Sequence, residues 1–246
     1  EGWPADPYTG ESLAGRYEIV RRIGADGTGL TFLGTSAKGK DRVVVRMLAP
    51  DLAGVSGLVN RFLAEIRKVR DLRDPLFPVV LDIGTGFGKE LTPYFVREYV
   101  EGESLAVLLS RDLAFDVPET LDIASRIAAG MHRAHARGLI HRHLRPDKIV
   151  FRGLRDPDPV KILDLGFAQV APLDEVTSMG HVDALRYAPP DGEEAPVDPR
   201  VDVYALGVLI YDMVSGLPEM RSSVHGSNPS PGRLSVVRPA LGKALD

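Results

Sequence analysis

Short apolar stretches, some of them rich in β-branched residues, recur through the first hundred positions, which is a pattern of β-strands. Such stretches lie at 20–23, 29–33 and 42–48, and a glycine-bearing turn separates the first two. Two more follow at 79–83 and 94–99. We therefore predict an antiparallel meander that begins near residue 16, preceded by an aperiodic tail over residues 1–16.

A helical pattern interrupts these strands once and then dominates the rest of the chain. Between Ser56 and Leu72, apolar residues recur at spacings of four, four and three, as in an amphipathic helix. Further helices are predicted at 105–109, 121–136 and 203–214, the last of them almost wholly apolar. Short strands are expected at 149–151 and 160–163. The pattern thus predicts a β-rich first lobe with one helix and a mainly helical second lobe.

Composition limits the class of protein without identifying it. The 246 residues are 44% hydrophobic and 26% charged, so the chain can bury a substantial core. Its formal net charge of −4 is too small to suggest binding to nucleic acid or to a membrane surface. No cysteine is present, which excludes disulfides and thiolate metal sites and fits a reducing compartment. We find no apolar run of membrane-spanning length. We expect a cytoplasmic segment, which a longer parent protein could anchor elsewhere.

The last stretch of the chain is poorly patterned. Residues 217–246 are rich in Ser, Pro and Gly, with one modest apolar cluster at 234–241. Loops longer than about 15 residues are uncommon inside a compact domain. We therefore predict that the second lobe is truncated or partly disordered after residue 217.

Residues 141–148, which read HRHLRPDK, carry the strongest chemical signal. They resemble the protein-kinase catalytic loop H-R-D-L-x-x-x-N. With the order of strands and helices given above, the chain resembles the bacterial serine/threonine protein kinase family over residues 17–246. This resemblance implies an α+β bilobal fold: an N-lobe of antiparallel sheet with one helix over 17–97, a hinge over 98–102, and a helical C-lobe over 103–246 that lacks the family's last helices.

The catalytic loop departs from the family pattern at its reactive positions. The family's Asp, which accepts the substrate hydroxyl's proton, corresponds to His143, and its metal-holding Asn corresponds to Lys148. Arg145 replaces a Lys that steadies the transferred phosphate. An imidazole can accept a proton but cannot anchor a hydroxyl as a carboxylate does. A metal site formed by His141 and His143 is disfavoured, because no third ligand lies at a recognisable spacing.

The phosphate-binding elements of the first lobe are also altered. The glycine-rich loop keeps the family's first and last glycines as Gly24 and Gly29 and has a further glycine at Gly27, but Asp26 stands at its second glycine and would repel a triphosphate. A tight hairpin turn explains the glycines equally well. Arg46 stands at the position of the family's phosphate-binding Lys, in the strand motif V-V-V-R.

Other first-lobe positions of the resemblance line the family's nucleotide site. Glu65 matches the helix Glu that pairs with the strand Lys, so we expect an ion pair between Arg46 and Glu65. Val44 and Thr31 add bulk and a hydroxyl where the family has an apolar adenine slot. Arg97 stands at the position that controls access behind the adenine, and we expect it to pair with Asp164 or Glu65, or else to extend outward.

The second lobe keeps one carboxylate that the family uses to bind metal. Asp164, in the sequence D-L-G, is the principal metal ligand if there is any. We expect Lys148 to lie beside it, either as a structural salt bridge or as a substitute for magnesium in metal-independent nucleotide binding. Ala184 replaces a Thr of the family's activation segment. Asp202 matches the buried Asp that holds the backbone of the catalytic loop.

The helix that carries Glu65 is unusually basic. Thr177 and Ser178 lie in the predicted activation segment, where a phosphate on either hydroxyl could order the segment through Arg142. Solvated surface charge and unmodified hydroxyls are the simpler alternatives. If the chain binds other signalling proteins, the activation segment and this helix are the expected surfaces, the helix through Arg61, Arg67, Lys68, Arg70 and Arg73.

These departures fall together on nucleotide and transfer chemistry, whereas the folding positions are retained. Phosphoryl transfer depends on positioning and electrostatic stabilisation by those groups. The resemblance therefore implies a pseudokinase that acts as a regulatory or scaffolding module, with no cofactor expected and only weak ATP binding, with or without Mg²⁺, as an alternative. Two alternatives remain: a nucleotide-binding switch without turnover, and an atypical kinase that uses Asp164 and relocated basic residues.

Overall fold

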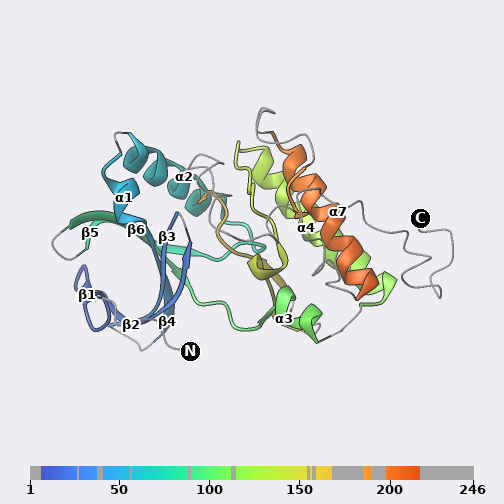
Figure 1. Ribbon diagram of the computed structural model, residues 1–246, viewed down its shortest axis with the longest axis horizontal. Coiled ribbons are helices and arrows are strands. Elements are labelled where there is room, and N and C mark those ends of the chain that lie inside the picture. Colours follow the sequence, from blue (N-terminus) through green and yellow to red (C-terminus); the bar gives the residue numbers. More distant parts are fainter. Residues whose placement is uncertain are drawn as a thin grey trace, which may run out of the picture.

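A computed structural model shows two lobes that lie side by side, one built mainly from strands and the other mainly from helices (Figure 1). It describes residues 7–26, 28–37, 41–55, 57–87, 90–111, 115–153, 156, 159–167, 186–189 and 198–216. The chain passes from the first lobe to the second after the strand that ends at Glu98. This arrangement agrees with the predicted α+β bilobal fold.

The first lobe is a six-stranded antiparallel sheet in the order β1-β2-β3-β4-β6-β5. The central strand β4 is the most apolar, and six of its seven residues are buried. β-branched side chains favour such a pleated, enclosed position. The strand bounds are Ser12–Leu13 for β1, Tyr17–Asp26 for β2, Gly29–Ser36 for β3, Arg42–Leu48 for β4, Val80–Phe87 for β5 and Glu90–Glu98 for β6.

The two faces of this sheet bury different sets of residues. Alternate residues of β4, including Val43 and Val45, pack on one face with Phe32 and Val96. The N-terminal segment covers that face, because Leu13 is fully buried there and the ring of Tyr8 packs edge-on against Phe32. Part of the predicted tail therefore belongs to the sheet. Leu13 lies in a segment without apolar periodicity, so the sequence pattern could not reveal its burial.

The helix α2 (Leu58–Leu72) lies against the sheet, after the short helix α1 (Pro50–Ala53) (Figure 1). It buries one stripe of side chains, as the apolar spacing predicts. Its opposite face carries the basic residues, which are exposed. The buried residues of α2 are Leu58, Phe62, Glu65, Ile66, Val69 and Leu72.

The second lobe contains a three-stranded sheet, β7-β8-β9, and three described α-helices. Ser104 and Asp116 accept backbone hydrogen bonds at the starts of α3 and α4, as N-caps do. The helices α4 and α7 pack against each other (Figure 1). The bounds are Glu103–Ser104 for β7, Leu105–Ser110 for α3, Val117–His135 for α4, Pro146–Lys148 for the 3₁₀ helix η1, Ile149–Phe151 for β8, Val160–Ile162 for β9 and Arg200–Ser215 for α7.

None of the described helices is both long enough and apolar enough to cross a lipid bilayer. The predicted truncation or disorder after residue 217, and the predicted lack of final helices, fall outside the described residues.

Candidate functional site

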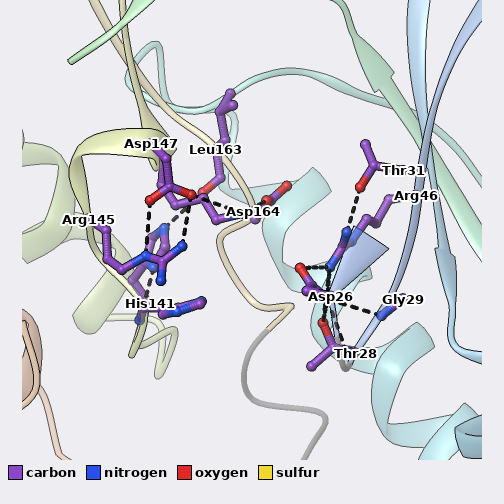
Figure 2. A network of polar contacts seen from close by, with 12 residues as sticks. Asp26, Thr28, Gly29, Thr31, Arg46, His141, Arg145, Asp147, Leu163 and Asp164 are labelled. Atoms are coloured by element: carbon purple, nitrogen blue, oxygen red, sulfur yellow. Dashed lines mark hydrogen bonds and ion pairs between the residues drawn. The ribbon is translucent and has the colours of Figure 1, made fainter. Parts of the chain in front are cut away.

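Five charged residues from both lobes come together where the lobes meet, and we refer to them as the interlobe site. Three come from the sheet of the first lobe, and two come from the second lobe, one at the end of η1 and one after β9. Figure 2 shows polar contacts around Arg46 on one side and around the 141–148 loop on the other. The five residues of the interlobe site are Asp26, Arg46, Arg97, Lys148 and Asp164.

The carboxylate of Asp26 folds back over its own turn (Figure 2). Its Oδ1 accepts hydrogen bonds from the backbone N–H of Thr28 at 3.0 Å and of Gly29 at 3.1 Å. The Thr28 hydroxyl donates a third bond at 2.5 Å. Asp26 therefore takes up backbone donors of the same loop that, in the resemblance, approaches the phosphates.

Arg46 completes the surroundings of this carboxylate. Its Nη2 lies 2.6 Å from both oxygens of Asp26 and 3.0 Å from the Thr28 hydroxyl. Its Nη1 donates to the hydroxyl of Thr31 on the neighbouring strand. Burial alone would raise the pKa of Asp26, but the charge and hydrogen bonds of Arg46 lower it to about 2. Asp26 is thus ionised at neutral pH, and Arg46 is 2% exposed.

The glycines of this loop differ in what they require. A Cβ on Gly29 would lie 1.9 Å from the carbonyl oxygen of Met47, so only glycine fits at that position. A Cβ on Gly24 would meet Thr31 at 3.6 Å, an ordinary contact. Gly24 therefore has no steric requirement for glycine, and Gly27 lies outside the described residues.

An aromatic ring covers the far side of the Arg46 guanidinium. The Phe167 ring centroid lies 4.0 Å from Arg46 Cζ, which is a cation–π contact. Phe167 also packs against Phe62 of α2, at 5.7 Å between ring centroids, and against Phe95 of β6, at 6.2 Å. The residue after the D-L-G sequence is therefore a core residue that joins the second lobe to the sheet and to α2.

The expected ion pair between Arg46 and Glu65 is not formed. Glu65 pairs instead with Lys68, one helical turn further along α2, at 2.6 Å. The second oxygen of Glu65, Oε2, is buried with no hydrogen-bond partner among the described residues. The physical reason is that Arg46 is already held by Asp26 and Thr31 and covered by Phe167.

Arg97 adopts neither of the two arrangements that the sequence suggested. It is 6% exposed, and no carboxylate of the described residues forms a salt bridge with it. Its Nη1 donates to the backbone carbonyl of Glu98 at 3.2 Å, and its Nε is buried without a partner. Burial lowers its pKa, against the opposing charge of Asp164. Arg97 is thus an incompletely compensated cation inside the interlobe site.

Val44 lies directly opposite Arg97 in the pairing of β4 with β6. Directly opposed residues of an antiparallel pair point to the same face of the sheet. Arg46 is two positions further along β4 and shares that face. Val44 is 2% exposed, so bulk at the predicted adenine position is present and enclosed.

The expected contact between Lys148 and Asp164 is present. Lys148 Nζ lies 2.7 Å from Asp164 Oδ2, and the two side chains are only 15% and 14% exposed. Burial would raise the pKa of Asp164, but Lys148, Arg46 and Arg97 together hold it far below the usual range. An ammonium group therefore stands against the carboxylate that the resemblance assigns to a metal.

His143 is not placed to act as a strong base. Burial lowers its pKa to about 3, and the charges of Arg145 and Lys148 contribute to this shift. Arg145 itself forms two hydrogen bonds with Asp147, at 2.9 and 3.0 Å. At neutral pH, His143 is uncharged and weakly basic, and Arg145 is engaged within its own loop.

The loop is held in shape by residues behind it. Asp202 of α7 accepts hydrogen bonds from the backbone N–H groups of His141 and Arg142, both at 2.8 Å, and contacts His135 at 2.8 Å. The His141 ring contacts the carbonyl of Leu163 at 2.8 Å. Arg142 has a positive φ of 62°, a conformation that a non-glycine residue needs such anchoring to keep. The anchoring role expected for Asp202 is therefore present.

Several predicted residues lie outside the described residues or apart from the interlobe site. Thr177, Ser178 and Ala184 belong to the first group. The basic residues of α2 are exposed and belong to the second. Within the part of the chain that the structure describes, no group of three or more His, Asp or Glu side chains is arranged to hold a metal ion.

Sequence reasoning missed two members of this region. Phe167 is one residue past the D-L-G sequence and reads only as one more apolar position. Thr28 gave no signal except its place between two glycines. A threonine two residues after an aspartate is a common local hydrogen-bonding arrangement, which could have indicated that the Asp26 side chain folds back.

A nucleotide with its magnesium ion does not fit the residues as they stand. The carboxylate of Asp26 lies on the loop donors that phosphates use in the resemblance, and the ammonium of Lys148 lies on Asp164. The negative charge of Asp26 would repel a phosphate chain, and the positive charge of Lys148 would repel a divalent cation. We therefore derive no chemical step through either group.

Comparison with known proteins places these features in context. Residues 17–229 match the family described as protein kinase domain. The serine/threonine-protein kinase pkn3 of Myxococcus xanthus is 31% identical over 219 residues, covering 86% of this chain and 40% of that protein. PknA of Mycobacterium tuberculosis is 33% identical over 214 residues, covering 85% of this chain and 49% of that protein. The chain thus spans less than half the length of these two relatives.

A solved structure is similar over almost the whole chain. It is the crystal structure of a variant of the Mycobacterium tuberculosis PknI kinase domain, with a TM-score of 0.69 and 25% sequence identity. The match covers 96% of this chain and 86% of that one. The bilobal architecture is therefore that of a kinase domain.

Proposed function

The chain belongs to the protein kinase domain family, and we propose that it is a pseudokinase of bacterial signalling, a domain that regulates or scaffolds other proteins without transferring phosphate. One observation carries this proposal. The ammonium of Lys148 lies 2.7 Å from Asp164, at the carboxylate that would hold the metal in the resemblance. A metal ion at that carboxylate would have to displace a largely buried ammonium, and the positive charge of that ammonium would repel it.

The loop around His143 supports the same conclusion. A general base works best when its pKa is near the working pH, and the pKa of His143 is about 3. Deprotonation of a substrate hydroxyl would therefore gain little from this imidazole. The loss of a positioned acid–base group lowers a rate by about 10²- to 10⁴-fold.

The first lobe adds a third obstacle. Arg46 contacts Asp26, Thr28 and Thr31, and Phe167 covers its guanidinium. A phosphate group would have to displace an ionised carboxylate from this arginine. The ion pair with Glu65 that marks the active arrangement in the resemblance is not formed.

In contrast, the features that maintain the fold are retained. Asp202 still anchors the 141–148 loop, and Phe167 still joins the lobes. A domain with its scaffold intact and its reactive groups internally paired is suited to binding partners in a cytoplasmic signalling protein. The exposed basic face of α2 is a candidate surface for such a partner.

A direct test measures phosphate transfer. The chain is incubated with γ-labelled ATP, Mg²⁺ or Mn²⁺ and a generic protein substrate, and the kinase domain of PknA serves as the positive control. We expect no labelling above that of the Asp164→Ala variant. Labelling that Asp164→Ala abolishes would overturn the proposal and would favour an atypical kinase.

A second measurement separates a silent domain from a nucleotide switch. Thermal denaturation is followed with ATP, with and without Mg²⁺. We expect no rise in Tm with either form. A magnesium-dependent rise of several degrees would refute the loss of the metal site and would identify a nucleotide-binding switch.

A further inference from the structure

The donors gathered around Asp26 form a set that suits an oxyanion. Two are backbone N–H groups of consecutive residues, Thr28 and Gly29, and they point at one oxygen atom from 3.0 and 3.1 Å. A hydroxyl at 2.5 Å and the Arg46 guanidinium at 2.6 Å complete the set. Consecutive backbone N–H groups beside an arginine are a general arrangement for binding phosphate-type anions.

Charge in the interlobe site is not balanced. Arg46, Arg97 and Lys148 supply three positive charges, whereas Asp26 and Asp164 supply two negative ones, so the five residues together carry one net positive charge. The imbalance is visible at Arg97, whose Nε is buried without a hydrogen-bond partner. If the Asp26 side chain left the site, the remaining four residues would carry two net positive charges.

The two lobes share this electrostatic environment. The charge of Lys148 helps to lower the pKa of Asp26, and Arg46 and Arg97 help to lower the pKa of Asp164. An anion in the place of the Asp26 carboxylate would therefore be attracted by cations of both lobes. Because those cations already supply the positive charge, a divalent metal would not be needed.

We propose that Asp26 is the built-in occupant of an anion site for phosphate chains, and that such a ligand binds, without metal, only when the Asp26 carboxylate is removed or displaced. This inference rests on the proposed function, since it concerns a site that does not catalyse transfer. The ligand class is a linear polyphosphate or the phosphate chain of a nucleotide. The occupant is held by five hydrogen bonds from three residues, namely Thr28, Gly29 and Arg46.

Protonation does not release the occupant near neutral pH. The pKa of Asp26 is about 2, so the carboxylate remains charged and paired with Arg46 throughout the physiological range. Opening the site therefore requires movement of the loop or substitution of Asp26. This gives a variant a clear advantage over a change of pH as a test.

The test compares the wild type with Asp26→Ala in isothermal titration with inorganic tripolyphosphate, in EDTA and at low ionic strength. We expect the variant to bind at least about tenfold more tightly, because a like charge leaves the site and its donors become free. Asp198→Ala is the matched control: Asp198 is also a carboxylate paired with an arginine, Arg200, but it lies just before α7 and outside the interlobe site. It should bind like the wild type.

A second variant shows that the gain arises at Arg46. The double variant Asp26→Ala, Arg46→Met should lose the added affinity. If Asp26→Ala does not fold, as judged by circular dichroism and thermal denaturation, Asp26→Asn keeps the size of the side chain and removes its charge, and it should shift affinity in the same direction. Equal affinity of the folded variant and the wild type, or an equal gain in Asp198→Ala, would overturn the proposal.

The result of the tripolyphosphate titration does not depend on the result of the phosphate-transfer assay. Phosphate transfer by the wild type would refute the pseudokinase proposal, whatever tripolyphosphate does in EDTA. Conversely, the absence of any gain in Asp26→Ala would refute the occupant proposal and leave the proposed lack of transfer standing.

Discussion

Replacing Lys148 by methionine removes the ammonium that faces Asp164 while keeping an unbranched side chain of similar length. The gross attraction across the 2.7 Å contact is about 6 kcal/mol at an effective dielectric constant of about 20. Desolvation of the two groups offsets much of that attraction, so the net effect is smaller. The substitution therefore measures the energetic cost of leaving Asp164 largely buried without its nearest cation.

The expected loss follows from burial and from the remaining charges. Removing one partner of a fully buried pair costs about 3 to 5 kcal/mol. Here the two side chains are 15% and 14% exposed, and Arg46 and Arg97 still favour the ionised form of Asp164. We therefore expect Lys148→Met to lower the free energy of unfolding by about 2 to 3 kcal/mol at pH 7.

Urea denaturation at pH 7 measures this difference, with the slope m compared between the proteins to confirm that both unfold in the same way. Arg126→Met is the control: Arg126 contacts Asp122 at 2.9 Å, with side chains 46% and 58% exposed, so its loss should change stability by only a few tenths of a kcal/mol. If Lys148→Met is no more destabilising than Arg126→Met, the Lys148 contact is not the structural pair that we describe.

Urea denaturation at low pH checks the direction in which the stability difference between the two proteins changes with pH. The pKa of Asp164 is lowered in the folded state, so its contribution is complete above the unfolded value of about 3.9 and is lost as pH falls below it. The difference between wild type and Lys148→Met should therefore be largest at neutral pH and should shrink below about pH 4. A difference that grows on acidification would contradict this account.

Three other changes test the surrounding framework. Asp202→Ala should lower the free energy of unfolding by about 3 to 5 kcal/mol in urea, because two backbone donors and a histidine lose a carboxylate that is 2% exposed. Leu13→Ala should cost about 2 to 4 kcal/mol, since this N-terminal side chain is fully buried, whereas Val20→Ala, at a position 42% exposed, should cost under about 0.5 kcal/mol; equal effects would place residue 13 outside the core. The pKa of His143 is about 3 in the folded state and about 6.5 in the unfolded state, so the free energy of unfolding of the wild type should fall as pH falls through that window. His143→Gln should reduce the dependence of this free energy on pH by up to about 1.4 kcal/mol per pH unit, measured by urea denaturation at a series of pH values.

Local patterns predicted the elements well because each element buries one periodic set of residues. The apolar spacing over 56–72 led to α2 at Leu58–Leu72, and the β-branched run over 42–48 is β4 itself. The same patterns predicted the order of the lobes, and the resemblance to a kinase then supplied the anchor Asp202. In these cases the local pattern and the global fold favour the same structure.

Charge pairing could not be predicted in the same way, because it depends on which partners lie close in space. For Arg46 the resemblance predicted an ion pair with Glu65, whereas in the structure its partner is Asp26. The outcome also depends on Phe167, whose ring covers the guanidinium and whose position is not encoded by any periodicity. For Arg97, the sequence argument rested only on the energetic cost of burying an unpaired charge. In the structure the backbone carbonyl of Glu98 accepts one hydrogen bond from this side chain.

The replacements at Asp26 and Arg46 make physical sense only together. A guanidinium has two terminal nitrogens in a fixed plane, and here Nη1 reaches Thr31 while Nη2 reaches Asp26. A lysine ammonium is a single point of charge and would have to favour one of them. Without Arg46, in turn, the Asp26 carboxylate would lose the cation that lies 2.6 Å from both of its oxygens. The pair of Lys148 with Asp164 follows the same logic in the second lobe. Loss of either member of a pair would leave an uncompensated charge at these places. Because Asp26 pairs with Arg46 and Lys148 pairs with Asp164 at hydrogen-bond distance, each pair compensates the burial of its own charges inside the interlobe site.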